Sequence, residues 1–416
     1  MKKLLVIFAM FVSMSASGQP SWQSYTIDTS QNLNFVKFTN TQTGFVTSNR
    51  LFLKTTNGGV NWVLLNTTYR LFVTQFIIDP NMLWYSDYMQ LSVPPYNPIG
   101  NLFKSVNGGS IWSLVLSDFN IGYNDIYFLN ALTGWSRVNW YLYRTTNGGS
   151  NWVTFTLPTW ITGLHFLNLN YGFCRSANGT NNIYRSSNGG ANWTSIYTTN
   201  NSISNFTFLD TINGYLCANV INNSFHGLVS KTTNGGYNWT EILRDSNNIN
   251  NIFFVNVNTG YALSKPHTLF RTSNGGLNWS KQIPDSTETL NAIHFINAYT
   301  GWLAGNHGLL LYTTNGGSTF VNEINGNIPE KYLLSQNYPN PFNPTTKIQF
   351  EVPSSKFVKI VVFDILGKEV QTLVNESLQP GTYETSFDGS SLTSGVYFYR
   401  LITNEFTETK KMLLIK

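Results

Sequence analysis

The sequence predicts an all-β protein, with a seven-bladed β-propeller followed by a small immunoglobulin-like β-sandwich. Three observations carry this prediction. Apolar residues make up 42% of the 416 residues, aromatic residues 15% and charged residues only 11%, and such β-favouring, charge-poor composition is unlike that of a disordered chain. A short motif recurs at intervals near forty residues. The composition then shifts near Pro329, where this motif stops.

The repeated motif begins with a basic residue, contains Asn-Gly-Gly and in most copies ends with tryptophan, as from Lys54 to Trp62. Its asparagines are Asn57, Asn107, Asn147, Asn188, Asn234, Asn274 and Asn315, separated by 40 to 50 residues. An apolar strand, a turn and a Gly-aromatic pair such as Gly134-Trp135 precede most copies. Each unit therefore predicts four strands, and this period indicates propeller blades.

The chemistry of the motif is that of a tight turn. Asn-Gly is a hairpin signal in which both residues must accept a positive φ, and the asparagine and a preceding Thr or Ser can bond nearby amides. The closing tryptophan is expected to pack between neighbouring blades. We assign a structural role, as an alternative to seven ligand sites, to Asn57, Gly58, Trp62, Asn107, Gly108, Trp112, Asn147, Gly148, Trp152, Asn188, Gly189, Trp193, Asn234, Gly235, Trp239, Asn274, Gly275, Trp279, Asn315 and Gly316.

The number of motifs predicts seven blades, with six or eight as the alternatives. Trp22 lies in a segment that matches the strand after the motif, although no motif precedes it. This segment can close the ring by pairing into the last blade, which removes the free sheet edges. The propeller is expected to span residues 19–325.

The first 18 residues have the pattern of a secretory signal peptide. Lys2 and Lys3 precede the apolar run Leu4 to Val12, and cleavage after Gly18 would expose Gln19. The apolar run is too short for a membrane span, and no second stretch predicts one. The formal net charge is +5 and basic residues never cluster, so nucleic acid is not an expected partner.

Few residues suggest chemistry. Cys174 and Cys217 are interpreted as buried small residues, with a disulfide as the alternative. His165 and His294 occupy the same slot of the repeat, which favours shared packing over metal binding. No metal-ligand spacing occurs, and no cofactor is expected. Asp118 with Asp125 is the nearest guess for a glycosidase pair.

The basic residues that open six of the motifs would form a ring on a closed propeller. They are Lys54, Lys104, Arg144, Arg185, Lys231 and Arg271. Solvated charges at strand ends are the favoured interpretation, with attraction of an anionic glycan as the alternative.

Aromatic residues outside the motif are the candidate ligand-binding residues. The segment from Asp79 to Gly100 is about ten residues longer than its equivalents in the other repeats, and further aromatics follow in the next repeat. Exposed aromatics on loops commonly recognise carbohydrate or protein, although a loop can also pack its own aromatics. The candidates are Trp84, Tyr85, Tyr88, Tyr96, Trp140 and Trp160.

The C-terminal region, after a linker at residues 326–332, predicts several short alternating strands over residues 333–416. Ordered sequence blocks mark it: Asn337-Tyr-Pro-Asn-Pro-Phe-Asn-Pro344, Phe363-Asp-Ile-Leu-Gly367-Lys-Glu-Val370, Gly395-Val-Tyr-Phe-Tyr-Arg400 and Lys410-Lys411-Met412. With all blocks in order, the region resembles the type A sorting domain of the type IX secretion system. The resemblance implies export through the periplasm of a Gram-negative bacterium and an outer-membrane translocon as partner.

The repeats resemble the Asp-box, or bacterial neuraminidase repeat, with Asn in place of Asp and an extra Gly. They look closer to the propellers of photosystem II stability/assembly factors and of some xyloglucan-degrading hydrolases. This resemblance implies a fold and no particular activity. Taken together, the sequence predicts a secreted or cell-surface propeller that is a non-catalytic binder of glycan or protein. An extracellular glycoside hydrolase and a surface-structure component without a discrete ligand are the alternatives.

Overall fold

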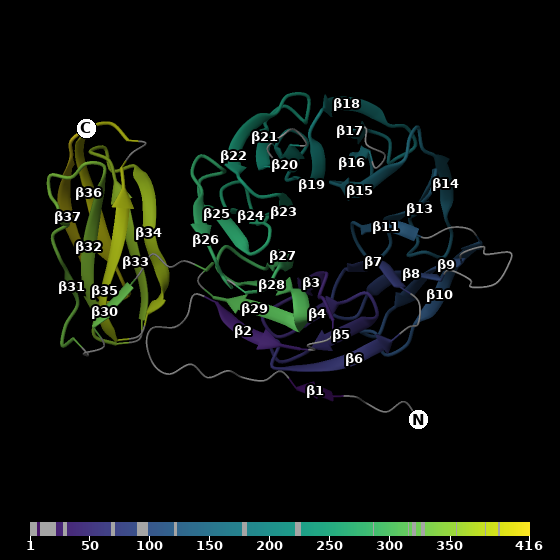
Figure 1. Ribbon diagram of the computed structural model, residues 1–416, viewed down its shortest axis with the longest axis horizontal. Helices are drawn as coiled ribbons and strands as arrows, with labels where there is room; N and C mark the ends of the chain where they lie inside the picture. Colours follow the sequence, from purple (N-terminus) through teal and green to yellow (C-terminus); the bar gives the residue numbers. More distant parts are fainter. Residues whose placement is uncertain are drawn as a thin grey trace. The chain divides into compact units, whose positions relative to one another are not determined.

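A computed structural model describes residues 6–8, 22–27, 31–67, 71–89, 99–119, 123–176, 181–220, 226–285, 287–314, 316–317, 322–325, 329–354, 356–378, 380–389 and 392–416. The chain forms two compact units, one containing Gln23–Thr313 and the other Thr314–Lys416. In the first unit, seven antiparallel sheets surround a common centre (Figure 1). The prediction of a propeller is confirmed, and the described residues contain seven blades.

Each blade runs outward from an innermost strand. Blade 1 comprises β3 (Phe35–Phe38), β4 (Gly44–Thr47), β5 (Leu51–Thr55) and β6 (Asn61–Thr67), with β1 (Val6–Phe8) paired outside β6. Blade 2 comprises β7 (Leu71–Ile77), β8 (Leu83–Met89), β9 (Ile99–Ser105) and β10 (Ser113–Phe119). Blade 3 comprises β11 (Tyr123–Phe128), β12 (Gly134–Val138), β13 (Tyr141–Thr145) and β14 (Val153–Thr156). Blade 4 comprises β15 (Ile161–Phe166), β16 (Gly172–Ser176), β17 (Asn181–Ser186) and β18 (Thr194–Thr199).

The remaining blades follow the same order. Blade 5 comprises β19 (Ser202–Phe208), β20 (Gly214–Val220), β21 (His226–Thr232) and β22 (Thr240–Asp245). Blade 6 comprises β23 (Ile249–Phe254), β24 (Gly260–Ser264), β25 (Thr268–Thr272) and β26 (Ser280–Gln282). Blade 7 comprises β27 (Leu290–Phe295), β28 (Gly301–Gly305) and β29 (Leu309–Thr313), with a short 3-10 helix (Asn306–Gly308) between the last two.

The ring is closed by a strand from the start of the chain. β2 (Gln23–Thr26) pairs antiparallel with β29 and becomes the outermost strand of blade 7. This is the closure expected from the segment around Trp22, which is itself buried. Because β2 supplies the outer strand, blade 7 has four strands and joins two distant parts of the sequence.

The Asn-Gly-Gly turn is held by its own side chains. In blade 1, Asn61 N–H donates to Asn57 Oδ1 over 2.9 Å, and Gly59 N–H donates to Thr55 Oγ1 over 3.0 Å. The positive φ angles belong to Gly58 (73°) and Gly59 (99°). The expectation of a positive φ at the asparagine is wrong for the described copies, because this residue acts through its side-chain oxygen and the two glycines make the reversal. Asn315 lies outside the described residues.

The motif turns share one face of the propeller with the turns between first and second strands. Gly58 N–H donates to Gln42 O over 2.8 Å, and Gly148 N–H donates to Leu132 O over 2.8 Å. We call this face the motif face. The opposite face, which carries the links between blades and the turns between second and third strands, is the linker face.

Neighbouring blades are joined mainly by the aromatic residue of the Gly-aromatic pair. In five junctions this ring, and in a sixth the ring of Trp84, which follows Leu83, stacks on an aromatic ring of the next blade's innermost strand, with centroids 3.5 to 4.4 Å apart. The pairs are Trp302–Phe38, Trp84–Phe128, Trp135–Phe166, Phe173–Phe208, Tyr215–Phe254 and Tyr261–Phe295. At the junction of blades 1 and 2, Phe45 and the aliphatic Ile77 belong to one core cluster.

The motif tryptophans lie at the junctions between blades, as expected, in the same core clusters as aromatic residues of the preceding blade. Trp62 meets Phe38 of its own blade edge-on, with centroids 6.2 Å apart, and Trp279 meets Phe254 in the same way. Trp62 Nε1 also donates to Gly59 O, which closes the motif turn. Trp112 and Trp152 contact rings of the preceding blade. The tryptophan therefore supports the stacked junction from the side, and the Gly-aromatic ring forms the junction itself.

The motif cations connect blades. Lys54 Nζ donates to Gly108 O of blade 2 over 3.3 Å, and Lys104 Nζ donates to Gly148 O of blade 3 over 2.8 Å. The same two amines lie over the Phe45 and Trp84 rings. Burial lowers the pKa of both lysines. These lysines are therefore half-buried inter-blade contacts, and the interpretation as solvated strand ends is wrong for them.

Both cysteines are free and fully buried. Cys174 packs in a cluster with Trp135 and Phe166, whereas Cys217 packs in another with Tyr215 and Phe254. Burial raises the pKa of the Cys217 thiol to about 12. The favoured interpretation as small buried residues is confirmed.

The second unit contains two four-stranded antiparallel sheets. One has the order β30 (Asn322–Asn325), β35 (Gly381–Asp388), β32 (Thr345–Val352) and β31 (Leu333–Leu334). The other has the order β34 (Glu369–Leu378), β33 (Lys356–Phe363), β36 (Gly395–Ile402) and β37 (Thr407–Leu414). One apolar cluster with members from both sheets forms the core. β30 lies within the range expected for the propeller but pairs with β35 of this unit.

The ordered blocks of the second unit meet in space. Asn337 N–H donates to Tyr399 Oη over 2.8 Å, and Tyr399 Oη donates to Ser335 O over 2.7 Å. Asn340 Oδ1 accepts from Leu413 N–H in the last strand. Burial raises the pKa of Tyr399 to about 12. The Asn-Tyr-Pro block is therefore fastened to β36 and β37, which carry two of the other blocks.

The remaining marker residues of this unit lie in turns and on the last strand. Gly367 has a φ of 79° in the turn that follows β33. Gly395 opens β36. Lys410 forms an ion pair with Glu408 over 3.0 Å, while the backbone carbonyl of Lys411 accepts from Gln336 Nε2.

Candidate functional site

Two of the predicted ligand-binding aromatics are core residues. Trp84 and Tyr85 lie in β8 with 0% and 3% of their surface exposed, so the expectation that a loop presents them is wrong. Trp84 occupies the stacking position of blade 2 against Phe128. The backbone of Tyr88 also belongs to β8. Tyr96 lies outside the described residues.

Trp140 and Trp160 come together on the linker face. Trp140 is in the turn between β12 and β13, and Trp160 is in the link from blade 3 to blade 4. Their ring centroids are 6.0 Å apart with planes at 60°. Trp140 is 46% exposed and its neighbour Tyr141 43%. The link is fixed against the turn because Leu157 N–H donates to Trp140 O over 2.8 Å. We call Trp140, Tyr141 and Trp160 the aromatic cluster.

A charged group lies beside this cluster. Asp125 in β11 and Arg137 in β12 are cross-strand partners, and Arg137 Nε approaches Asp125 Oδ2 at 3.2 Å. Arg137 also donates to the backbone carbonyl of Asn139, next to Trp140. Gly163 N–H, two residues after Ile161, donates to Asp125 Oδ2 over 3.3 Å. The ion pair therefore positions both chain segments that carry the aromatic cluster.

Arg175 of β16 adds a second cation near the same carboxylate. Burial lowers the pKa of this guanidinium, and the charge of Asp125 partly offsets that shift. For Asp125, burial raises the pKa of the carboxyl group, against the effect of Arg137. Asp125 therefore interacts electrostatically with both guanidinium groups and is paired directly with that of Arg137.

The predicted glycosidase pair is not formed on neighbouring strands. Asp118 lies in β10, the outermost strand of blade 2, whereas Asp125 lies in β11, the innermost strand of blade 3. Asp125 is already held by Arg137. In the described part of the chain no three His, Cys, Asp or Glu side chains are placed to hold a metal ion. Among these residues there is also no helix long and apolar enough to cross a membrane.

The two histidines have equivalent positions on innermost strands, where His294 is buried and His165 half-buried. His165 Nε2 bonds Phe208 O over 2.8 Å, and His294 Nδ1 accepts from Phe38 N–H over 3.3 Å. Each therefore bonds the innermost strand of a neighbouring blade, in line with the shared packing role. Burial lowers the pKa of His165 and, together with the charge of Lys37, lowers that of His294 well below 6.5.

These shifts predict a loss of stability in mild acid. A histidine whose pKa is lowered by folding is protonated more readily in the unfolded chain, so stability falls as the pH drops below about 6.5. The free energy of unfolding should fall by up to about 1.4 kcal/mol per pH unit for each histidine. Denaturant unfolding between pH 7 and pH 5 measures this slope.

Suitable variants for this test come from the protein itself. Thr207 occupies the same slot in blade 5, so His165→Thr and His294→Thr should each flatten the slope. His307→Thr is the control, because its side chain is 64% exposed. If the His165→Thr/His294→Thr double variant keeps the same dependence of unfolding free energy on pH, the assignment of that dependence to these two histidines is contradicted.

The comparisons with known proteins agree with both units. Residues 336–416 match the family described as the secretion system C-terminal sorting domain, which confirms the predicted sorting domain. Such a domain directs export by the type IX secretion system and engages its translocon, so the protein is secreted or displayed at the cell surface. Residues 237–331 match the family described as photosynthesis system II assembly factor YCF48. No curated protein matches the chain.

Solved structures share the fold. A structure titled "YCF48 bound to D1 peptide" has a TM-score of 0.58 and 17% identity, covering 73% of this chain and 100% of its own. YCF48 from Cyanidioschyzon merolae has a TM-score of 0.54 and 17% identity, with 70% and 98% covered. An ancestral GH74 enzyme has a TM-score of 0.52 and 13% identity, covering 96% of this chain and 64% of its own. At these identities the likeness shows the fold alone.

Proposed function

We propose that the protein is an exported, non-catalytic binding scaffold whose ligand site is the aromatic cluster on the linker face. The supporting observation is the meeting of Trp140 and Trp160, two large rings from separate connections, at a partly exposed position. Rings placed in this way recognise sugars and protein side chains at low entropic cost, because the scaffold holds them in advance. The ligand is an extracellular glycan or protein.

The surrounding charge supports binding over catalysis. Asp125 is engaged by Arg137 and by the backbone N–H of Gly163, so it serves as an anchor for the two connections. A glycosidase needs two carboxyl groups flanking the scissile bond, and Asp125 has no described carboxylate partner at the cluster. The structure of YCF48 bound to a D1 peptide is an example of a propeller of this fold that binds a peptide.

Substitution of the two tryptophans tests the site. The Trp140→Ala/Trp160→Ala variant should bind its ligand at least about 30-fold more weakly, because a buried aromatic anchor contributes about 2 kcal/mol or more to an interface. The ligand is identified on a glycan array and by affinity measurement against extracellular proteins of the producing cells. Tyr237→Ala is the control, because Tyr237 is an aromatic of similar exposure (54%) on the motif face.

The outcomes separate the proposal from its rival. Ligand binding that survives in the double variant contradicts the assignment of the site. A parallel screen measures sugar release from the same glycans. Hydrolysis that one carboxylate substitution, such as Asp125→Asn, abolishes would replace the binding scaffold by a glycoside hydrolase. The proposed route is secretion across the inner membrane with removal of residues 1–18, and then passage from the periplasm through the outer-membrane translocon.

A further inference from the structure

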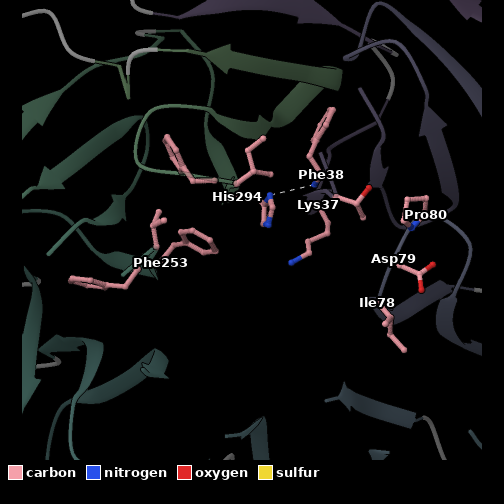
Figure 2. A pocket seen from close by; sticks show the side chains of 12 residues that line it. Lys37, Phe38, Ile78, Asp79, Pro80, Phe253 and His294 are labelled. Carbon is pink, nitrogen blue, oxygen red and sulfur yellow. Dashed lines mark hydrogen bonds between the residues drawn. The ribbon is translucent and has the colours of Figure 1, made fainter. Parts of the chain in front are cut away.

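A hollow lies at the axis of the propeller on the motif face, apart from the aromatic cluster. It has a volume of about 450 Å³ and is lined by the ends of the innermost strands of blades 6, 7, 1 and 2. Its walls include Phe253, Ile78 and Ile296, which are apolar, together with Lys37, Asp79 and His294 (Figure 2). The volume is within the range of small-molecule sites.

Lys37 occupies a position that the other blades use differently. The residues before the last position of the innermost strands form a ring of equivalent positions, which in blades 1 to 7 holds Lys37, Phe76, Tyr127, His165, Thr207, Phe253 and His294. Tyr127 donates to Phe166 O and His165 bonds Phe208 O, so the polar atoms of both side chains are already bonded to the backbone of the next blade. Lys37 is the cation of this ring, and among the described residues its amine has no hydrogen-bond or ion-pair partner.

The other charged group of the pocket does not neutralise this amine. Asp79 Oδ1 accepts from Asn81 N–H over 2.7 Å and from Met82 N–H over 2.9 Å, so its carboxylate belongs to the turn after β7. Burial lowers the pKa of Lys37, which reflects the cost of holding a cation there without a counter-charge. An anionic ligand would remove that cost.

His294 supplies a second donor. Because Phe38 N–H donates to His294 Nδ1, this nitrogen carries no hydrogen, and the neutral ring has its hydrogen on Nε2. Figure 2 shows the Lys37 side chain extending beside His294 into the open centre. One wall of the pocket therefore presents an ammonium group and an imidazole N–H side by side, and Phe253 lies beyond them.

We propose that this axial pocket binds the carboxylate of an apolar acid, with Lys37 Nζ and His294 Nε2 donating to its oxygens. The apolar body of the ligand packs against Phe253 and Ile78. The inference concerns a site separate from the linker-face cluster and does not depend on it. The same carboxylate chemistry is available from a free small acid and from the C-terminus of a peptide, which the probes below distinguish.

Calorimetric titration of the purified chain tests the proposal with matched acids and amides. The probes are phenylacetate and phenylacetamide, and N-acetyl-alanyl-phenylalanine with a free or an amidated C-terminus. We expect at least one acid to bind with a Kd below about 10 mM, and its amide to bind at least about tenfold more weakly, as for loss of a charge-assisted hydrogen bond. Tighter binding of phenylacetate indicates a small acid, and tighter binding of the peptide indicates a chain terminus.

The Lys37→Met variant should weaken binding of the same acid at least about tenfold while the thermal unfolding transition stays cooperative. Lys265→Met is the matched control, because Lys265 is an exposed lysine in the turn between β24 and β25 on the linker face. The Trp140→Ala/Trp160→Ala variant should bind the acid normally, which separates this site from the aromatic cluster. The proposal is overturned if no acid binds, if the amides bind equally well, or if Lys37→Met binds like the unmodified chain.

Discussion

Gly260→Leu is expected to destabilise the propeller strongly, and Phe254→Ile in the same chain should restore much of the loss. Phe254 and Gly260 are cross-strand partners in blade 6, and a Cβ added at Gly260 would lie 2.4 Å from Phe254 Cε1. The Phe254 ring fills the space that a side chain at position 260 would need. Overpacking of this kind costs about 1–3 kcal/mol or more.

Blade 2 already contains the combination of residues that the double variant would introduce into blade 6. Its corresponding partners are Ile77 and Leu83, whereas the other six blades pair a phenylalanine with a glycine at this register. A smaller residue on the innermost strand thus accompanies a larger residue on the second. The total volume across the pair is what the core requires.

A double-mutant cycle measures this compensation. Unfolding free energies of the two single variants and of Gly260→Leu/Phe254→Ile should give a favourable coupling energy of about 1–3 kcal/mol. The double variant still loses the stacking of Phe254 on Tyr215, so it should remain less stable than the unmodified chain. Gly260→Leu with Phe128→Ile in blade 3 is the control and should be additive within about 0.5 kcal/mol. Additivity in the blade 6 pair itself would contradict the volume argument.

The propeller was predictable because each of its blades carries a local signal. Asn-Gly-Gly with a preceding Thr or Ser specifies a turn by bonds within five residues, as Thr55 and Asn57 show. The closing strand was predictable from its likeness to the strand after the motif. The φ angle of the asparagine was not predictable from the Asn-Gly pair. Because a second glycine follows, the two residues with positive φ are the two glycines and not Asn and Gly.

The failure at Trp84 has a specific cause. Blade 2 has Leu83 where the other blades have glycine, so the Gly-aromatic pattern that marks this position in the other blades does not identify Trp84. Its distance from the Asp79 turn matches the stacking position of the other blades, and that spacing could have placed it in the core.

The candidate site was predictable only in parts. Trp140 and Trp160 stand out as aromatics, but their contact depends on how one turn and one inter-blade link meet in space. The Asp125–Arg137 pair follows from strand register. Phe128 and Gly134 are cross-strand partners, and three residues further along each strand Asp125 lies opposite Arg137. Lys37 gave no periodic signal, because its slot carries a lysine in one blade alone.

Removal of the C-terminal unit should abolish delivery to the cell surface or medium. The sorting blocks converge through Asn337, Tyr399 and Asn340, so the translocon is presented with one folded surface that a chain without this unit lacks. The measurement is the distribution of the protein among periplasm, cell surface and medium in a producing strain with the type IX system. We expect a chain ending at Thr313 to be retained in the periplasm.

A gain-of-function experiment distinguishes sorting from a general folding defect. Residues 314–416 fused to an unrelated periplasmic reporter should carry it to the surface, because this segment includes β30 and β31, the two edge strands of one sheet. Asn337→Ala should reduce export of the fusion, since it removes the side-chain bonds to Pro339 O and Thr346 Oγ1 that hold the first block in place. Gln371→Ala, in the edge strand β34 of the opposite sheet, is the matched control and should export normally. Surface delivery of the chain ending at Thr313 would show that the sorting signal lies elsewhere.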